Sequence, residues 1–135
     1  MADRCWGTRS TFAYAWRSQL SHNVPLAFGS DAPVESPNPF LGIHAAVTRR
    51  RADGTPSAQG RYPEQRLNVD EALHAFTIGA AYAAGMEDHL GNLPPGYLAD
   101  LLILNDDPYS CPPKGLLTIK PIATIVGGEW VYSAG

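Results

Sequence analysis

The length, composition and charge of the chain describe an ordinary globular unit. It has 135 residues, of which 44% are hydrophobic and 17% are charged, so it is neither a disordered tail nor much more than one domain. Its formal net charge of −3 offers no overall cationic field to hold nucleic acid or an anionic membrane surface. We therefore expect no nucleic acid and no membrane among its partners.

The sequence also indicates the compartment. The longest nearly uncharged apolar stretch, residues 98–104, is far shorter than the roughly 20 residues that a membrane helix needs. The first residues, MADRCWGTRS, contain no apolar core segment of the kind found in secretion signals. Cys5 and Cys111 form no CxxC pair and predict neither a zinc knuckle nor a disulfide framework. We expect a cytoplasmic protein.

The first predicted elements are a helix and a buried strand. Apolar residues at helical spacing predict an amphipathic helix over residues 11–22. The apolar run 24–28, closed by Gly29, is typical of a strand buried on both faces. The stretch that follows, residues 30–40, contains three prolines and continues neither element. We expect it to be a long loop at the carboxyl end of the strand.

Two further helices are predicted before residue 88. One begins near Pro39, a favoured first-turn residue, and ends at the arginines 49–51. Asn68 followed by Glu71 is a capping-box arrangement that predicts a second helix, continuing to Gly85.

The pattern becomes extended in the last third of the chain. Residues 97–104 are predicted to form a strand, and residues 122–126 and 129–132 a hairpin around Gly127-Gly128. The sequence therefore divides into a helical part around one buried strand, residues 1–88, and a small β part, residues 89–135.

This division leaves a difficulty with the buried strand. A strand buried on both faces needs parallel neighbours, and residues 1–88 supply no second convincing strand. We expect the chain to be the last part of something larger, or to assemble with another copy or another chain.

Asp31 is the best candidate for a functional residue. It follows the predicted buried strand in the sequence AFGSDAPV, and α/β folds place ligands and catalytic groups at the carboxyl ends of such strands. A second interpretation is structural, because Ser30 and Asp31 are also common in Asx turns and caps. Spacing alone leaves both open.

The other polar residues favour structural roles. No two of the four histidines stand at a metal-ligand spacing. His44 and His74 lie beside apolar positions and are expected to pack in the core or in a groove. Residues 49–51 are interpreted as a solvated cationic cap at a helix end and receive no function.

Four consecutive segments carry a family resemblance. They read AFGSDAPVESPNPFLGIHAAVTR, YPEQRLNVDEALHAFTIGAAYAAG, GNLPPGYLADLLILNDDP and ATIVGGEWVY. In this order they resemble the C-terminal part of the amidohydrolase superfamily, specifically the branch that contains the N-substituted formamide deformylases. The resemblance covers nearly all of residues 4–132.

The resemblance implies an α/β fold, the C-terminal portion of a (β/α)8 TIM barrel with part of a small flanking β-sandwich. Residues 1–88 would hold the last barrel strand and its flanking helices, and residues 89–135 the closing strands of the sandwich. Asp31 would match the family's aspartate after the eighth strand, which approaches the metal and takes a proton from the attacking water. The implied cofactor is a divalent metal, with zinc as the expected ion, and the implied substrate is a small amide-like molecule.

The departure from the family pattern matters as much as the agreement. The family's HxH pair, its bridging mid-barrel residue and its two later histidines precede this region and have no counterpart here. A complete barrel takes roughly 250 residues. We expect a fragment that is inactive alone and that needs the missing N-terminal barrel portion or a homo-oligomer.

Two functional hypotheses remain. The first is a metal-dependent amidohydrolase that cleaves a non-peptide carbon–nitrogen bond once the chain is completed, with Asp31 as catalytic and metal-contacting residue. The alternative is a non-catalytic interaction or assembly module derived from that fold, because exposed strand edges and apolar faces attract partners.

Overall fold

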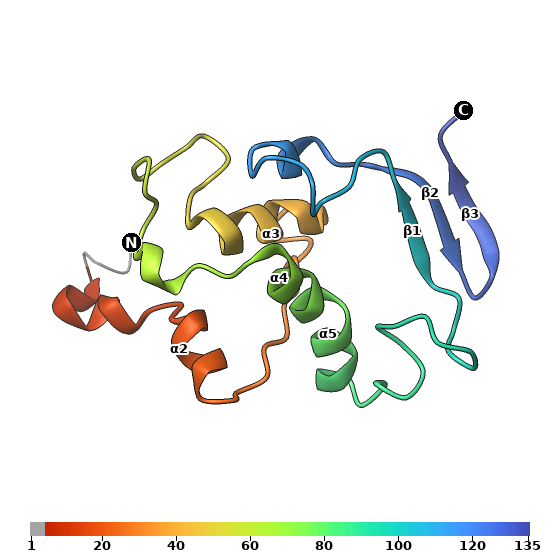
Figure 1. The fold of residues 1–135 in the computed structure, drawn as a ribbon, viewed down its shortest axis with the longest axis horizontal. Coiled ribbons are helices and arrows are strands. Elements are labelled where there is room, and N and C mark those ends of the chain that lie inside the picture. Colours follow the sequence, from red (N-terminus) through yellow and green to blue (C-terminus); the bar gives the residue numbers. More distant parts are fainter. Residues whose placement is uncertain (1–4) are drawn as a thin grey trace.

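The computed structural model describes residues 5–135 (Figure 1). Helices and 3-10 turns come first, and a small antiparallel sheet with the strand order β1-β2-β3 follows. None of the helices in the described part is long and apolar enough to cross a membrane. In chain order the elements are η1 (Gly7–Phe12), α2 (Trp16–Ser21), α3 (Pro39–Thr48), η2 (Pro63–Gln65), α4 (Val69–Phe76), α5 (Ile78–Ala83), β1 (Leu101–Leu104), η3 (Gly115–Thr118), β2 (Pro121–Val126) and β3 (Glu129–Ser133).

The helix starts that the sequence predicted are confirmed. Pro39 opens α3, and the side chain of Asn38 accepts a hydrogen bond from the backbone N–H of Phe40. At the start of α4, the side chains of Asn68 and Glu71 exchange the two hydrogen bonds of a capping box. These caps satisfy backbone N–H groups that a helix start otherwise leaves without partners.

Two predicted helices are shorter than expected. The helix predicted over residues 11–22 is split into η1 and α2, because Tyr14 adopts a left-handed backbone with φ of 58° between them. The helix predicted from Asn68 to Gly85 breaks at Thr77, which is the C-cap residue of α4 and the N-cap residue of α5.

The C-terminal hairpin is confirmed. Gly127 and Gly128 both have positive φ, 58° and 84°, as the tight turn between β2 and β3 requires. β1 pairs antiparallel with β2 and starts at Leu101, later than the predicted residue 97. The sheet stands to one side of the helices (Figure 1).

One hydrophobic core connects the two parts of the chain. Phe40 and Ile43 of α3 are buried in it, and so are Leu116 and Ile119 from the segment around η3. The segment between β1 and β2 therefore returns to the helices and packs on α3. The division at residue 88 stays a prediction, and this shared core lies across it.

The prediction of a strand over residues 24–28 is wrong for the chain as it stands. Residues 24–31 have no strand assignment, and the sheet of the described residues contains only β1, β2 and β3. The physical reason is the one that the sequence raised: parallel strands exist only beside neighbours, and residues 5–135 provide none at this place.

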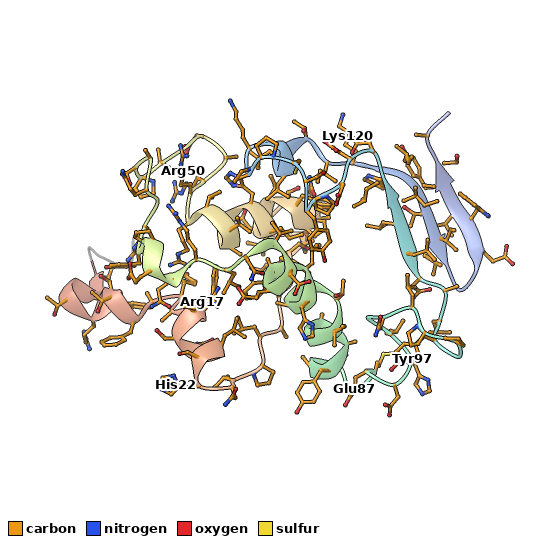
Figure 2. All side chains as sticks on the ribbon, in the orientation of Figure 1. Arg17, His22, Arg50, Glu87, Tyr97 and Lys120 are labelled. Carbon is orange, nitrogen blue, oxygen red and sulfur yellow. The ribbon has the colours of Figure 1, made fainter. Side chains whose placement is uncertain are left out.

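An ion pair between Arg17, labelled in Figure 2, and Glu71 fixes α2 against the start of α4. The guanidinium of Arg17 donates to both carboxylate oxygens of Glu71, at 2.6 and 2.5 Å, and to the backbone carbonyl of Arg66. The hydrogen bond from Arg17 is the main cause that lowers the pKa of Glu71. Glu71 thus serves the capping box and the ion pair together.

The pH dependence of stability tests this contact. Because the folded pKa of Glu71 is lowered, its contribution is present above the unfolded pKa and is lost as the pH falls through the folded pKa. Both side chains are partly exposed, so we expect a loss of about 1 kcal/mol or less. Glu71→Gln should flatten this acid limb in urea unfolding, whereas Glu87→Gln, an exposed carboxyl, should leave it unchanged. An equal slope in wild type and Glu71→Gln would contradict the assignment.

Candidate functional site

The segment of residues 24–31, which carries Asp31, is held against α4 and α5. The backbone N–H of Phe28 donates to the carbonyl of Ala75 at 2.9 Å. The carbonyl oxygen of Leu26 approaches α5 so closely that a Cβ on Gly79 would lie 2.0 Å from it. Only glycine allows this approach, so Gly79 sets how near the segment lies to the helix.

Aromatic side chains hold the same segment from both sides. The ring of Phe28 lies 5.0 Å from that of Trp16 on α2 and 5.5 Å from that of Phe76 on α4, measured between centroids. Tilted and edge-on contacts at these distances are favourable beyond the area that they bury. Phe28 therefore fixes the segment three residues before Asp31.

The prediction of a solvated cationic cap is wrong for Arg49. Its guanidinium carbon lies 4.7 Å from the centroid of the Trp16 ring, and its Nε donates to the backbone carbonyl of Arg61 at 3.0 Å. Arg49 is only 9% exposed, and burial is the main cause that lowers its pKa. A guanidinium can be buried in this way because an aromatic face and a carbonyl replace water.

Asp31 is exposed at the end of the 24–31 segment. Its φ of 59° is left-handed, and its carbonyl accepts hydrogen bonds from Val34 at 2.9 Å and Glu35 at 3.2 Å. The chain therefore reverses at Asp31 itself, whereas Gly29 needs no positive φ. The structure assigns no hydrogen bond to the Asp31 carboxylate within residues 5–135, and the residue is exposed.

The described residues do not form a metal centre by themselves. Among residues 5–135 no group of three His, Cys, Asp or Glu side chains is arranged to hold a metal ion. His44 is buried in α3, His74 is exposed beside an apolar groove, and the ring of His22 contacts the carbonyl of Ser18 at the end of α2. Among the described residues, Asp31 and these histidines form no three-residue group that could hold a metal ion.

The groove beside His74 is lined in part by the 24–31 segment. It has a volume of about 600 Å³, and its lining is mostly apolar. Leu26 of the segment, Leu20 of α2 and Ile78 of α5 contribute to its walls.

Nearly the whole chain matches the model of a protein family. A model of the Amidohydrolase family, Amidohydro_3, matches residues 2–132. The chain belongs to the amidohydrolase family.

Individual relatives agree with this family. The protein YtcJ of Bacillus subtilis is 35% identical over 133 residues, which are 96% of this chain and 24% of YtcJ. The N-substituted formamide deformylase of Arthrobacter pascens is 32% identical over 116 residues, covering 86% of this chain and 21% of the deformylase. This amidohydrolase-family chain thus spans less than a quarter of the length of these relatives.

A solved structure supports the fold. The crystal structure of an amidohydrolase from Thermotoga maritima superposes with a TM-score of 0.64 at 18% sequence identity. The match covers 89% of this chain and 26% of the other. The fold of most of this chain is therefore found within a solved amidohydrolase structure.

The sequence pattern does not indicate that Gly79 and Phe28 hold the backbone before Asp31. It places Gly79 within a long predicted helix and Phe28 within a predicted strand. A glycine in the middle of an apolar helical pattern is the one signal that could have indicated a close backbone approach.

The close approach at Gly79 predicts a specific stability loss. In Gly79→Ala the new Cβ must displace the carbonyl of Leu26, so we expect unfolding to become easier by about 2 kcal/mol. Gly29→Ala is the matched control on the same segment, because no atom beyond its chain neighbours lies within 4 Å of its Cβ position. Urea titrations measure both. A Gly79→Ala protein as stable as Gly29→Ala would show that the segment is not held against α5.

Proposed function

We propose that this chain supplies the Asp31 carboxylate and the surrounding C-terminal elements to an amidohydrolase that cleaves a non-peptide carbon–nitrogen bond of a small molecule. The observation that carries the proposal is the family match over residues 2–132, which includes the 24–31 segment with Asp31. The printed name of the Arthrobacter relative indicates an N-substituted formamide as a first substrate class to test.

The surroundings of Asp31 support a role in proton transfer. The carboxylate is exposed, and no described residue hydrogen-bonds to it, so it is free to accept a proton from a water molecule that attacks a carbonyl. The same carboxyl can then return the proton to the leaving nitrogen. Phe28 and Gly79 hold the preceding backbone, which keeps the carboxylate at a defined place.

We further propose that residues 24–28 become the last strand of a (β/α)8 barrel when parallel neighbours are supplied. The segment is already held against α4 and α5 on one side. Asp31 would then stand at the carboxyl end of a barrel strand, where such enzymes place their catalytic groups.

A divalent metal, with zinc as the expected ion, is not held by the described residues alone. Asp31 is one carboxylate, whereas a catalytic zinc ordinarily has three protein ligands. We propose Asp31 as a metal-contacting residue of the completed protein.

An assembly role is the second candidate, and the sheet favours it. Every residue of β3 is exposed, and Trp130, Val131 and Tyr132 are 64%, 59% and 48% exposed. A strand edge with apolar side chains of this size is a surface that another chain can cover. This role requires no contribution from Asp31.

A chimera tests the catalytic proposal. This chain would replace the matched segment of the Arthrobacter deformylase, and amine release from an N-substituted formamide would be measured. We expect activity in the chimera and a loss of about a hundredfold or more in Asp31→Asn, because a general acid-base carboxyl contributes at least that much.

A matched variant controls for the loss of a carboxyl from this loop. Glu35→Gln removes an exposed carboxyl from the same loop and should keep the activity. Equal rates for Asp31→Asn and Glu35→Gln would contradict a catalytic role. A folded chimera without activity, together with self-association of the 135-residue chain that Trp130→Ser abolishes, would favour the assembly role.

A further inference from the structure

A second cleft lies between α3 and the segment around η3, away from Asp31. It has a volume of about 200 Å³. Its walls come from His44 and Thr48 of α3, from the loop of residues 50–54 and from Pro113, Lys114 and Leu117. Figure 1 shows this loop and η3 on the same side of α3, and Figure 2 labels Arg50 on the loop. No residue of the 24–31 segment lines the cleft.

Three cations line the cleft without a carboxylate partner. Among residues 5–135 the structure gives one ion pair, between Arg17 and Glu71, so no carboxylate oxygen of these residues lies within 4.0 Å of the charged nitrogens of Arg50, Arg51 or Lys114. The chain as a whole carries a net charge of −3. The lining of this cleft, with three cations and one carboxylate, Asp53, is therefore positive although the chain as a whole is negative.

The one carboxylate in the cleft is engaged elsewhere. Asp53 accepts hydrogen bonds from the backbone N–H and the hydroxyl of Thr55, at 2.9 and 2.8 Å. These two hydrogen bonds are the main causes that lower its pKa, and the charge of Arg51 contributes less. Asp53 thus shapes the loop through Thr55 and offsets part of the charge of Arg51 at longer range, without a direct ion pair.

The loop holds Arg50 in place over the cleft. Its Nε donates to the carbonyl of Gly54 at 3.2 Å, and its backbone N–H donates to the hydroxyl of Thr48 at 3.1 Å. Gly54 has φ of 90°, and a Cβ on it would lie 3.0 Å from Nη2 of Arg50. The guanidinium is therefore packed closely against the loop, while its Nη groups remain available as donors.

His44 adds a buried polar ring to the wall of the cleft. It is only 6% exposed as a residue, and its ring nitrogens are not among the fully buried side-chain atoms that lack a partner in the described part of the chain. Burial first, and then the positive charge of Arg50, lower its pKa. A ring nitrogen on the wall of a cationic cleft can donate a hydrogen bond to an anion that enters the cleft.

We propose that the cleft between His44, Arg50 and Lys114 binds a small oxyanion of the phosphate class. The anion would accept charge-assisted hydrogen bonds from Arg50 and Lys114, offset the repulsion among the three cations and give the ring of His44 an acceptor. The ligand is either free phosphate or the phosphate group of a small molecule. This binding does not depend on the proposed hydrolysis.

Calorimetric titration of the full 135-residue chain tests the proposal. Inorganic phosphate and glycerol 2-phosphate are titrated at constant ionic strength, with chloride as the competing anion. We expect saturable binding of phosphate and a roughly tenfold loss of affinity in Arg50→Gln and in Lys114→Gln, since each removes one charge-assisted hydrogen bond. Lys120→Gln is the matched control, because it removes one exposed positive charge that does not line the cleft. Tighter binding of the monoester would identify a phosphorylated small molecule as the ligand.

The histidine ring gives an independent readout. Sulfate keeps its charge over the range in which histidine titrates, so an NMR titration with sulfate isolates the ring. We expect sulfate to move the pKa of His44 upward, because a nearby anion favours the charged imidazole, and we expect the ring signals of the exposed His89 to stay in place.

Opposite results would overturn the proposal. They are an absence of saturable phosphate binding to the wild-type chain, equal affinities in Lys114→Gln and Lys120→Gln, or a His44 titration that sulfate leaves unchanged. Lys114 is exposed, so its variant keeps the test valid if Arg50→Gln fails to fold.

Discussion

The approach of one backbone segment to one helix determines the place of the candidate site. The carbonyl of Leu26 lies where a side chain on Gly79 would have to stand, and the N–H of Phe28 donates to Ala75. Because these contacts come just before Asp31, they decide where its carboxylate stands. Trp16 and Phe76 pack on Phe28 from α2 and α4, so three helical elements converge on this segment.

The parts of the fold that the sequence predicted well depend on local physics. A capping box needs only Asn68 and Glu71, and a tight hairpin needs only two residues that tolerate positive φ. The strand at residues 24–28 was predicted from its apolar run, yet a strand exists only when another strand accepts its hydrogen bonds. Information about that neighbour is not contained in the local pattern. The amidohydrolase relatives are more than four times as long as the matched segment, which gives room for such neighbours.

Local sequence patterns indicate some of the site residues, whereas others depend on contacts with distant elements. Asp31 could be proposed from its place after an apolar run, and its role stays a prediction. The burial of Arg49 could not be foreseen, because it depends on Trp16 and on the carbonyl of Arg61, which come from other elements. The cationic cleft likewise joins the loop after α3 to Lys114, and no spacing in the sequence indicates that these residues meet.

Hydrogen exchange of the backbone amides in the 24–31 segment tests the central claim most directly. The account predicts a protected amide at Phe28, bonded to Ala75, beside fast-exchanging amides at Ala27 and Gly29, which have no described backbone acceptor. This pattern would mean that one edge of the segment is hydrogen-bonded to α4, while the amides on its other edge are open to pairing with another strand. Fast exchange at Phe28 would contradict the pinned segment, and equal protection of all three amides would contradict the unpaired edge.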